Sequence, residues 1–399
     1  MTTPDFRLML RLILLAVVLA LAAPLPGQGR TVTHAASARP RATWTLEVRP
    51  AVTIGGDGVE GPTEFSDILG VIRTASGRIA VAVGAELRIF AADGRFERTL
   101  GRKGAGPGEF NLAWSVTSIQ DTLYATDNTE RLNVFAPDGT VLRSLARPQL
   151  PGAMRPQWTA HFSDGSALLV ARRIVGDSTG TVDVPLKLAR MSADGSTLTD
   201  LVEIPGYREY RQAGRRPDFA RMGGVVRVFG RGDRFCAGHL SEWRLQCYDP
   251  AARPILSVVR TVPPRRITED DRQFYRDAYV NANDRCMKAP DCAPRMREEM
   301  RLWRFADVAP PFSRALMTAE GDVWLSDYDR TYGSLGTRAF VTPREPLRFN
   351  VFDRAGAWVA GITLPARFTP YDAGRDWVLG VAIDDDEVER VVLWRYRRS

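Results

Sequence analysis

The sequence repeats itself at a shift of 45 residues, and this repeat limits the folds open to the chain. At that shift GDGVEGPTEF (56–65) matches GRKGAGPGEF (101–110) at five positions. LRIFAADGRFERTL (87–100) likewise matches LNVFAPDGTVLRSL (132–145) at seven of fourteen positions. Periods of 40–50 residues made of short strands and Asp-Gly turns are typical of a β-propeller, in which each repeat forms one four-stranded blade.

The glycine-rich segment 101–110 also resembles a phosphate-binding loop. A P-loop requires G-x-x-x-x-G-K-[ST] between a strand and a helix. Here Lys103 comes early in the loop, no Ser or Thr follows it, and strand-like sequence continues after Phe110. We therefore interpret the segment as a connector between repeats, whose glycines permit positive φ. Phe65 and Phe110 are expected to pack into the core between neighbouring sheets.

Fainter copies of the strand pattern continue to the C-terminus and predict an all-β, six-bladed β-propeller. The expected strand pairs are 76–83 with 87–90, 121–127 with 132–135, 164–172 with 188–195, 232–239 with 243–249, 321–328 with 347–356, and 376–384 with 391–397. The strand-like segment WTLEVRPAVTIGG (44–56) is expected to complete the sixth blade and close the ring, which would remove open sheet edges. The propeller is thus assigned to residues 44–399, and residues 30–43 to a linker.

The N-terminal segment 1–29 has the pattern of a secretory signal. Arg7 and Arg11 precede an apolar run over 12–23, which small residues and prolines follow. This run is short against the ~20 residues of a membrane span, although an uncleaved N-terminal anchor stays an alternative. We expect an exported, periplasmic or extracellular monomer that touches a membrane only through this segment.

The charge of the chain gives no support for a nucleic-acid partner. Five arginines and one acidic residue lie in residues 1–43, which leaves 49 basic and 46 acidic residues in the rest. Nucleic-acid binding requires a basic patch on the folded part of a protein. We therefore expect no such partner.

The four cysteines are expected to form two disulfides. If 232–239 and 243–249 pair as antiparallel strands around a turn near Ser241, Cys236 and Cys247 face each other and can be bridged. Residues 266–305 are expected to form a helical insertion, with Thr268 and Asp271 as a capping box. Pro294 would then begin a second helix, and a Cys286–Cys292 bridge would close the turn between the helices. A zinc site is disfavoured because C-x-x-C pairs and neighbouring histidines are lacking.

The strand, Asp-Gly turn and glycine connector together resemble those of NHL-repeat proteins, especially exported bacterial six-bladed propellers. The best match is LYATDNTERLNVFAPDG (123–139), in which Asp127, Arg131 and Phe135 correspond to the Asp, Arg and Phe of the repeat. The match covers about residues 55–145 and becomes diffuse beyond them. Propellers of this kind are mainly binding scaffolds, so the resemblance implies a fold more than an activity.

Enzymes on related propellers supply the alternatives. Amidating lyases bind zinc through several histidines. This chain has only His34, His161 and His239, and His34 falls in the expected linker. Lactonase-like hydrolases hold Ca²⁺ in the central tunnel through Glu, Asn and Asp. Asp at a strand end is also a common turn former. The candidate ligands for Ca²⁺ are Asp127, Asn128, Asp327 and Asp329.

From the sequence we expect a non-catalytic scaffold that binds a peptide, glycan or protein at one face of its ring, with no cofactor. The candidate ligand-binding residues follow from their position in the repeat. They are Asp127, Asn128, Arg131, Asp327, Tyr328 and Asp329. The alternative is a divalent-metal-dependent hydrolase with its site in the tunnel.

Overall fold

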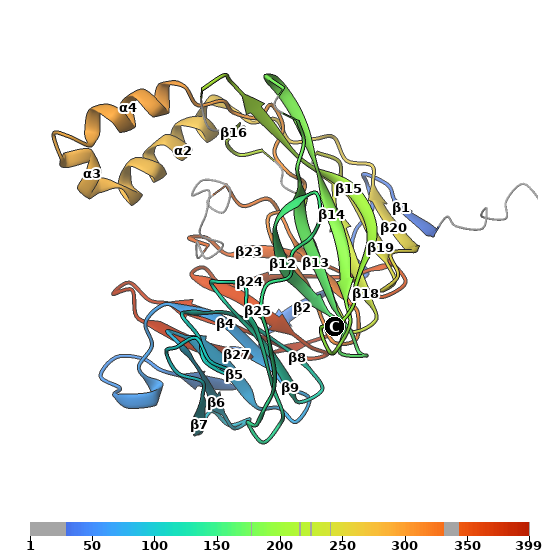
Figure 1. Ribbon diagram of the computed structural model, residues 1–399, viewed down its shortest axis with the longest axis vertical. Helices are drawn as coiled ribbons and strands as arrows, with labels where there is room; N and C mark the ends of the chain where they lie inside the picture. Colours follow the sequence, from blue (N-terminus) through green and yellow to red (C-terminus); the bar gives the residue numbers. More distant parts are fainter. Residues whose placement is uncertain are drawn as a thin grey trace, which may run out of the picture.

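The computed structural model describes residues 29–398, except for residues 177, 215–216, 224–225, 240 and 331–342. The expected leader thus lies outside the described residues, apart from Gly29. Every helix within the described residues is too short or too polar to span a lipid bilayer. The fold is all-β, with curved sheets and one small helical insertion (Figure 1).

The strands form five sheets, and nearly all pair antiparallel with their neighbours in sequence. The first group is β4 (Ile68–Arg73), β5 (Ile79–Val83), β6 (Glu86–Phe90) and β7 (Phe96–Leu100). The second is β8 (Ala113–Ile119), β9 (Thr122–Asp127), β10 (Leu132–Phe135) and β11 (Val141–Leu145). The third is β12 (Ala153–His161), β13 (Ala167–Arg173), β14 (Gly180–Met191), β15 (Leu198–Arg211) and β16 (Asp218–Phe219).

The later strands continue this order. The fourth group is β17 (Val228–Arg231), β18 (Arg234–Gly238), β19 (Arg244–Tyr248) and β20 (Pro254–Arg260). The fifth is β21 (Ala315–Met317), β22 (Val323–Ser326), β23 (Leu347–Phe352) and β24 (Trp358–Leu364), and the sixth is β25 (Phe368–Ala373), β26 (Trp377–Ile383) and β27 (Glu389–Arg397). The fifth and sixth groups belong to one nine-stranded sheet. The strand pairs expected from the sequence are therefore present.

The first strands of the six groups contact one another in a closed cycle. Strand β4 contacts β8, and the contacts continue through β12, β17, β21 and β25 back to β4. The last of these contacts joins the first strand group to the sixth, although about 300 residues of chain separate them. The apolar core lies between successive groups, where the alternate side chains of neighbouring sheets meet.

The N-terminal segment runs along the outer edges of the last three groups. Strand β1 (Arg30–His34) pairs parallel with β20, and β2 (Ala42–Leu46) pairs parallel with β24 and antiparallel with the end of β27. Strand β3 (Val52–Ile54) then pairs antiparallel with β27. The expected outer strand of the last group is thus supplied by 52–54. The segment 30–43, expected as a linker, instead contains β1 and the first two residues of β2.

The glycine connector encloses a carboxylate of its own chain. Oε2 of Glu109 accepts a hydrogen bond from the N–H of Gly106 at 2.8 Å, and Oε1 accepts one from Nε of Arg102 at 2.8 Å. Gly101 has φ 80°, and a Cβ there would lie 2.5 Å from the buried ring of Phe110. The loop therefore acts as a turn that lets Phe110 enter the core, as the repeat predicts.

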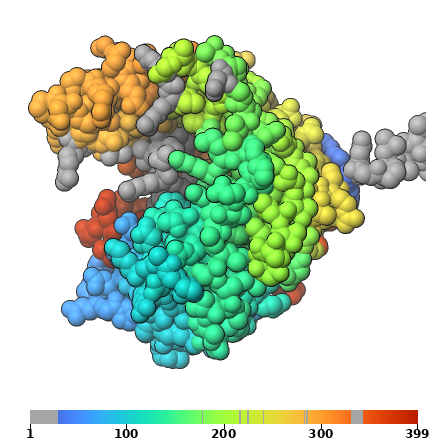
Figure 2. Space-filling view, in the orientation of Figure 1, coloured from blue at the N-terminus to red at the C-terminus, as the bar shows by residue number. Residues whose placement is uncertain are grey.

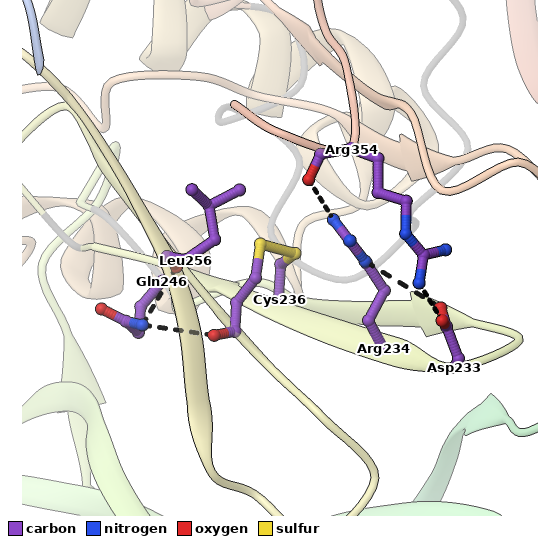
Figure 3. Close-up of a disulfide and its surroundings, with 7 residues drawn as sticks. Asp233, Arg234, Cys236, Gln246, Leu256 and Arg354 are labelled. Atoms are coloured by element: carbon purple, nitrogen blue, oxygen red, sulfur yellow. Dashed lines mark hydrogen bonds and ion pairs between the residues drawn. A yellow bond between two sulfur atoms is a disulfide. The ribbon is translucent and has the colours of Figure 1, made fainter. Parts of the chain in front are cut away.

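The disulfide Cys236–Cys247 joins directly opposed residues of β18 and β19, in the register expected from the sequence. It is buried in the core between the fourth and fifth groups. Beside it, Arg234 donates a hydrogen bond to the carbonyl of Arg354 at 2.9 Å, and Arg354 pairs with Asp233 (Figure 3). These contacts bind the β17–β18 turn to the β23–β24 turn.

The helical insertion projects from one end of the β-sheets (Figures 1 and 2). It consists of α2 (Glu269–Ala282), α3 (Asp284–Lys288) and α4 (Ala293–Arg301). Thr268 and Asp271 form the expected capping box, and Pro294 lies in the first turn of α4. The Cys286–Cys292 disulfide closes the segment between the helices. Two disulfides and no free cysteine among the described residues are typical of an oxidising compartment.

Candidate functional site

The first three candidate residues lie in the turn after β9. The carboxylate of Asp127 is buried, and its Oδ1 accepts from the main-chain N–H groups of Thr129 at 2.9 Å and Arg131 at 3.0 Å. The Thr129 hydroxyl donates to the same oxygen at 2.6 Å, and the N–H of Asn111 lies 3.4 Å from Oδ2. Asn128 accepts from the Asn111 amide at 2.9 Å. Asp127, Asn128 and Arg131 are thus brought together as one hydrogen-bonded turn.

These hydrogen bonds explain the acidity of Asp127. Burial by itself raises the pKa of a carboxyl group. The donors around Asp127, with the Thr129 hydroxyl foremost, outweigh burial and hold its pKa below the ordinary value. Arg131 in turn donates to the carbonyl of Gly106 at 3.0 Å, which ties the turn to the glycine connector.

The other three candidate residues follow β22 and have separate partners. Asp327 accepts a hydrogen bond from the side-chain amide of Asn350 at 2.8 Å. The ring of Tyr328 lies 4.9 Å from the guanidinium carbon of Arg265, and burial raises the pKa of its phenol. The main-chain N–H of Asp329 donates to the Ser313 hydroxyl at 2.6 Å.

The segment 327–330 is one of the places where the helical insertion meets the β-sheets. Arg330 pairs with Asp270 of α2 at 3.0 Å, and its guanidinium carbon lies 4.2 Å from the ring of Phe274. Arg265 pairs with Asp271 at 2.7 Å. Tyr328 itself packs against the apolar cluster that anchors the insertion. The candidate residues after β22 are therefore neighbours of the insertion.

No group of three or more His, Cys, Asp or Glu side chains is placed to hold a metal ion in the part of the chain that the structure describes. His34 lies in β1 and not in a free linker, so all three histidines belong to described structure. They lie apart. His34 bonds the carbonyl of Gly356, His161 the hydroxyl of Thr117, and His239 the main chain of its own turn.

A polar network that the sequence did not suggest joins four strand groups near the ends of their first strands. Asp372 of β25 accepts from the main-chain N–H of Arg73 at 3.0 Å and from Nη1 of Arg231 at 2.9 Å. Nη2 of Arg231 donates to the hydroxyl of Ser118 at 3.1 Å, which lies 3.4 Å from the carbonyl of Arg73. Burial raises the pKa of Asp372, although the Arg231 charge opposes this effect.

His161 is buried at the interface between the second and third groups. Its Nδ1 lies 3.1 Å from the hydroxyl of Thr117, and its ring lies 4.5 Å from the ring of Tyr124. Burial, assisted by the charge of Arg143, lowers the pKa of His161 to about 3. The imidazole is therefore neutral in the folded chain at neutral pH.

This neutral histidine predicts a loss of stability in weak acid. Below the ordinary histidine pKa of about 6.5, His161 is protonated in the unfolded chain but stays neutral in the folded chain. The free energy of unfolding therefore falls as the pH drops. We expect this one group to contribute a fall of about 1.4 kcal/mol per pH unit between pH 6 and 5. Urea denaturation between pH 6 and 5 should show that the free energy of unfolding of H161N depends less on pH than that of the unaltered protein. An unchanged dependence would contradict the assignment.

Comparisons with known proteins extend to the fold alone. No family model matches the sequence, and neither does any curated protein. A crystal structure of a DUF4221 family member from Bacteroides vulgatus has a TM-score of 0.51 at 9% identity, covering 90% of this chain and 100% of that chain. Raptor from Chaetomium thermophilum has a TM-score of 0.39 at 10% identity, covering 90% of this chain and 29% of that chain. The first likeness supports an all-β fold and assigns no activity.

The polar network around Asp372 and the parallel strand β1 were not predicted from the sequence. Arg231 and Asp372 are 141 residues apart, and no local pattern connects them. A signal exists in hindsight, because Arg73, Ser118, Arg231 and Asp372 each lie at or near the end of the first strand of a group. An alignment of the fainter repeats at that position would have placed the four residues together.

Proposed function

We propose that this chain is an exported, non-catalytic six-bladed β-propeller that binds a peptide, glycan or protein at the face bearing the helical insertion. The closed cycle of first strands supports six blades, since each blade of a propeller places its innermost strand around one axis. The pairing of β3 with β27 supports ring closure, because a strand from the N-terminus then completes the last blade. The expected leader and the two disulfides support export.

The observation that carries the binding proposal is the position of three connections at one end of the strands. The turn 127–131, the segment 327–330 and the insertion all leave second strands or enter first strands, which places them on one face of such a ring. The ion pair between Arg330 and Asp270 joins two of these connections directly. Loops held by a rigid scaffold are the usual carriers of binding residues.

Selection from a phage-displayed random peptide library and a glycan array would test this proposal with residues 30–399. We expect D327A and R131A to weaken the binding of the selected ligands about thirtyfold, the loss that corresponds to ~2 kcal/mol at an interface hot spot. R78A is the matched control, because Arg78 lies beside the β4–β5 turn at the opposite end of the strands and pairs with Glu97. If the ligands lose affinity for R78A and keep it for D327A and R131A, the binding site lies on the opposite face and the proposal is contradicted.

The absence of a catalytic metal is a separate expectation. A scaffold without a structural ion should melt at the same temperature with and without a chelator, because removing a bound ion lowers stability only where the folded chain binds it. Thermal melting with EDTA, together with the metal content of the purified chain, checks this point. One tightly bound divalent ion and a lower Tm in EDTA would contradict the expectation of no bound metal and favour the metal-dependent hydrolase alternative.

A further inference from the structure

The junction between the first and sixth strand groups completes the cycle of first strands. Its apolar part is large and includes Ile68 and Val71 of the first group with Leu379 and Leu393 of the sixth. Polar contacts cross the same junction at both ends. Glu389 accepts from the main-chain N–H of Ile68 at 2.8 Å on one side.

On the other side, Arg73 makes two contacts with the sixth group. Its main-chain N–H donates to Asp372, and its guanidinium carbon lies 5.0 Å from the ring of Trp377. Asp372 is thus shared between the junction and Arg231, whose strand β17 lies opposite β4 in the cycle of first strands. The Arg231 side chain therefore extends from β17 to the ends of β4 and β25, where the first and sixth groups meet.

Both members of this ion pair are withdrawn from water. The Asp372 side chain is 2% exposed and that of Arg231 is 16% exposed. An ion pair in such a place stabilises a fold only when both partners and their hydrogen bonds are complete, and removing one partner is strongly destabilising. The ion pair together with its hydrogen bonds to Arg73 and Ser118 is complete only when the first, second, fourth and sixth groups are all in place.

We infer that Arg231 and Asp372, with the main-chain N–H of Arg73, form a latch that ties the fourth strand group to the junction of the first and sixth groups. This inference goes beyond the proposed ligand binding, since it concerns how the ring stays closed. Breaking the pair should let the junction open locally, before the rest of the sheets unfold. Local opening of this kind is measured by the exchange of individual amide hydrogens under native conditions.

Native-state hydrogen exchange of R231M and D372N tests the latch. In both variants we expect the amides of β4 and β25 to exchange about tenfold faster or more, while β13 and β14 of the third group keep their rates. R253M is the matched control, because its exposed ion pair with Asp249 lies in a turn far from the axis. R231M leaves the bond between Asp372 and the Arg73 N–H in place, so it serves if D372N does not fold.

Two results would overturn the latch. Unchanged exchange in β4 and β25 of R231M would show that the pair does not hold the junction. A rise of equal size in β13 and β14 would show that the pair supports the whole fold and no particular junction. The result of the ligand selection is independent of either, because the variants tested there lie at the other end of the strands.

Discussion

Replacing Trp44 by alanine is expected to lower the free energy of unfolding by about 3–5 kcal/mol, the usual cost of emptying a large aromatic site in a core. Trp44 belongs to the N-terminal segment and is 6% exposed. Its ring stacks on Tyr396 at 5.0 Å and lies 6.0 Å from the ring of Trp324. The substitution therefore weakens the attachment of the N-terminal segment to both the fifth and the sixth strand groups.

Val48 supplies the control for this prediction. It lies in the same segment, between β2 and β3, and is 95% exposed. V48A should change the free energy of unfolding by less than about 0.5 kcal/mol, as surface substitutions usually do. Denaturation in guanidinium chloride measures both variants. If W44A were as harmless as V48A, the N-terminal segment would not be part of the folded core.

Replacing Phe110 by alanine is the second change of large expected effect, again about 3–5 kcal/mol. Phe110 is fully buried between the first and second strand groups and lies 6.1 Å from the ring of Phe135. Its partner in the 45-residue repeat is Phe65, which is only half-buried and packs edge-on against Phe90. F65A should therefore cost less, about 1–2 kcal/mol.

Comparing F110A with F65A tests whether equivalent positions of the 45-residue repeat contribute equally to stability. Both occupy the end of a glycine connector, and both follow a glutamate. Only the connector of Phe110 has its glutamate hydrogen-bonded to a glycine N–H within the loop. Equal losses for F110A and F65A in the same denaturation experiment would contradict the different burial of the two rings.

Local pattern predicted those parts of the fold that depend on neighbours in the sequence. The opposition of Cys236 and Cys247 followed from one short turn, and the capping box at Thr268 followed from a spacing of three residues. The burial of Phe110 followed from its place in the repeat. Each of these predictions needs only the strand or helix period and a turn, and the structure confirms all three.

Features that depend on residues far apart in the chain could not be predicted from the sequence. Strand β1 pairs parallel with a strand more than 200 residues away, and its short sequence has no partner signal of its own. The roles of the candidate residues likewise depend on partners that the sequence does not indicate. Repeat position singled out Asp127 and Arg131, but the role of Asp127 in shaping its turn depends on donors from Thr129 and Asn111. The network of Arg231 and Asp372 depends on four strand groups at once.

The central claim is that the chain closes on itself through β3 and β27, and a cross-linking measurement tests it most directly. Thr53 and Val392 are directly opposed in this pair of strands. Cysteines at both positions should form a disulfide on mild oxidation, as opposed residues lie about 4.5–5.5 Å apart. The control pair, Thr53 with Arg390, is two residues out of register and too far apart to be bridged. Mass spectrometry after alkylation should find the bridge only in T53C/V392C, and free thiols in that variant would contradict the closed ring.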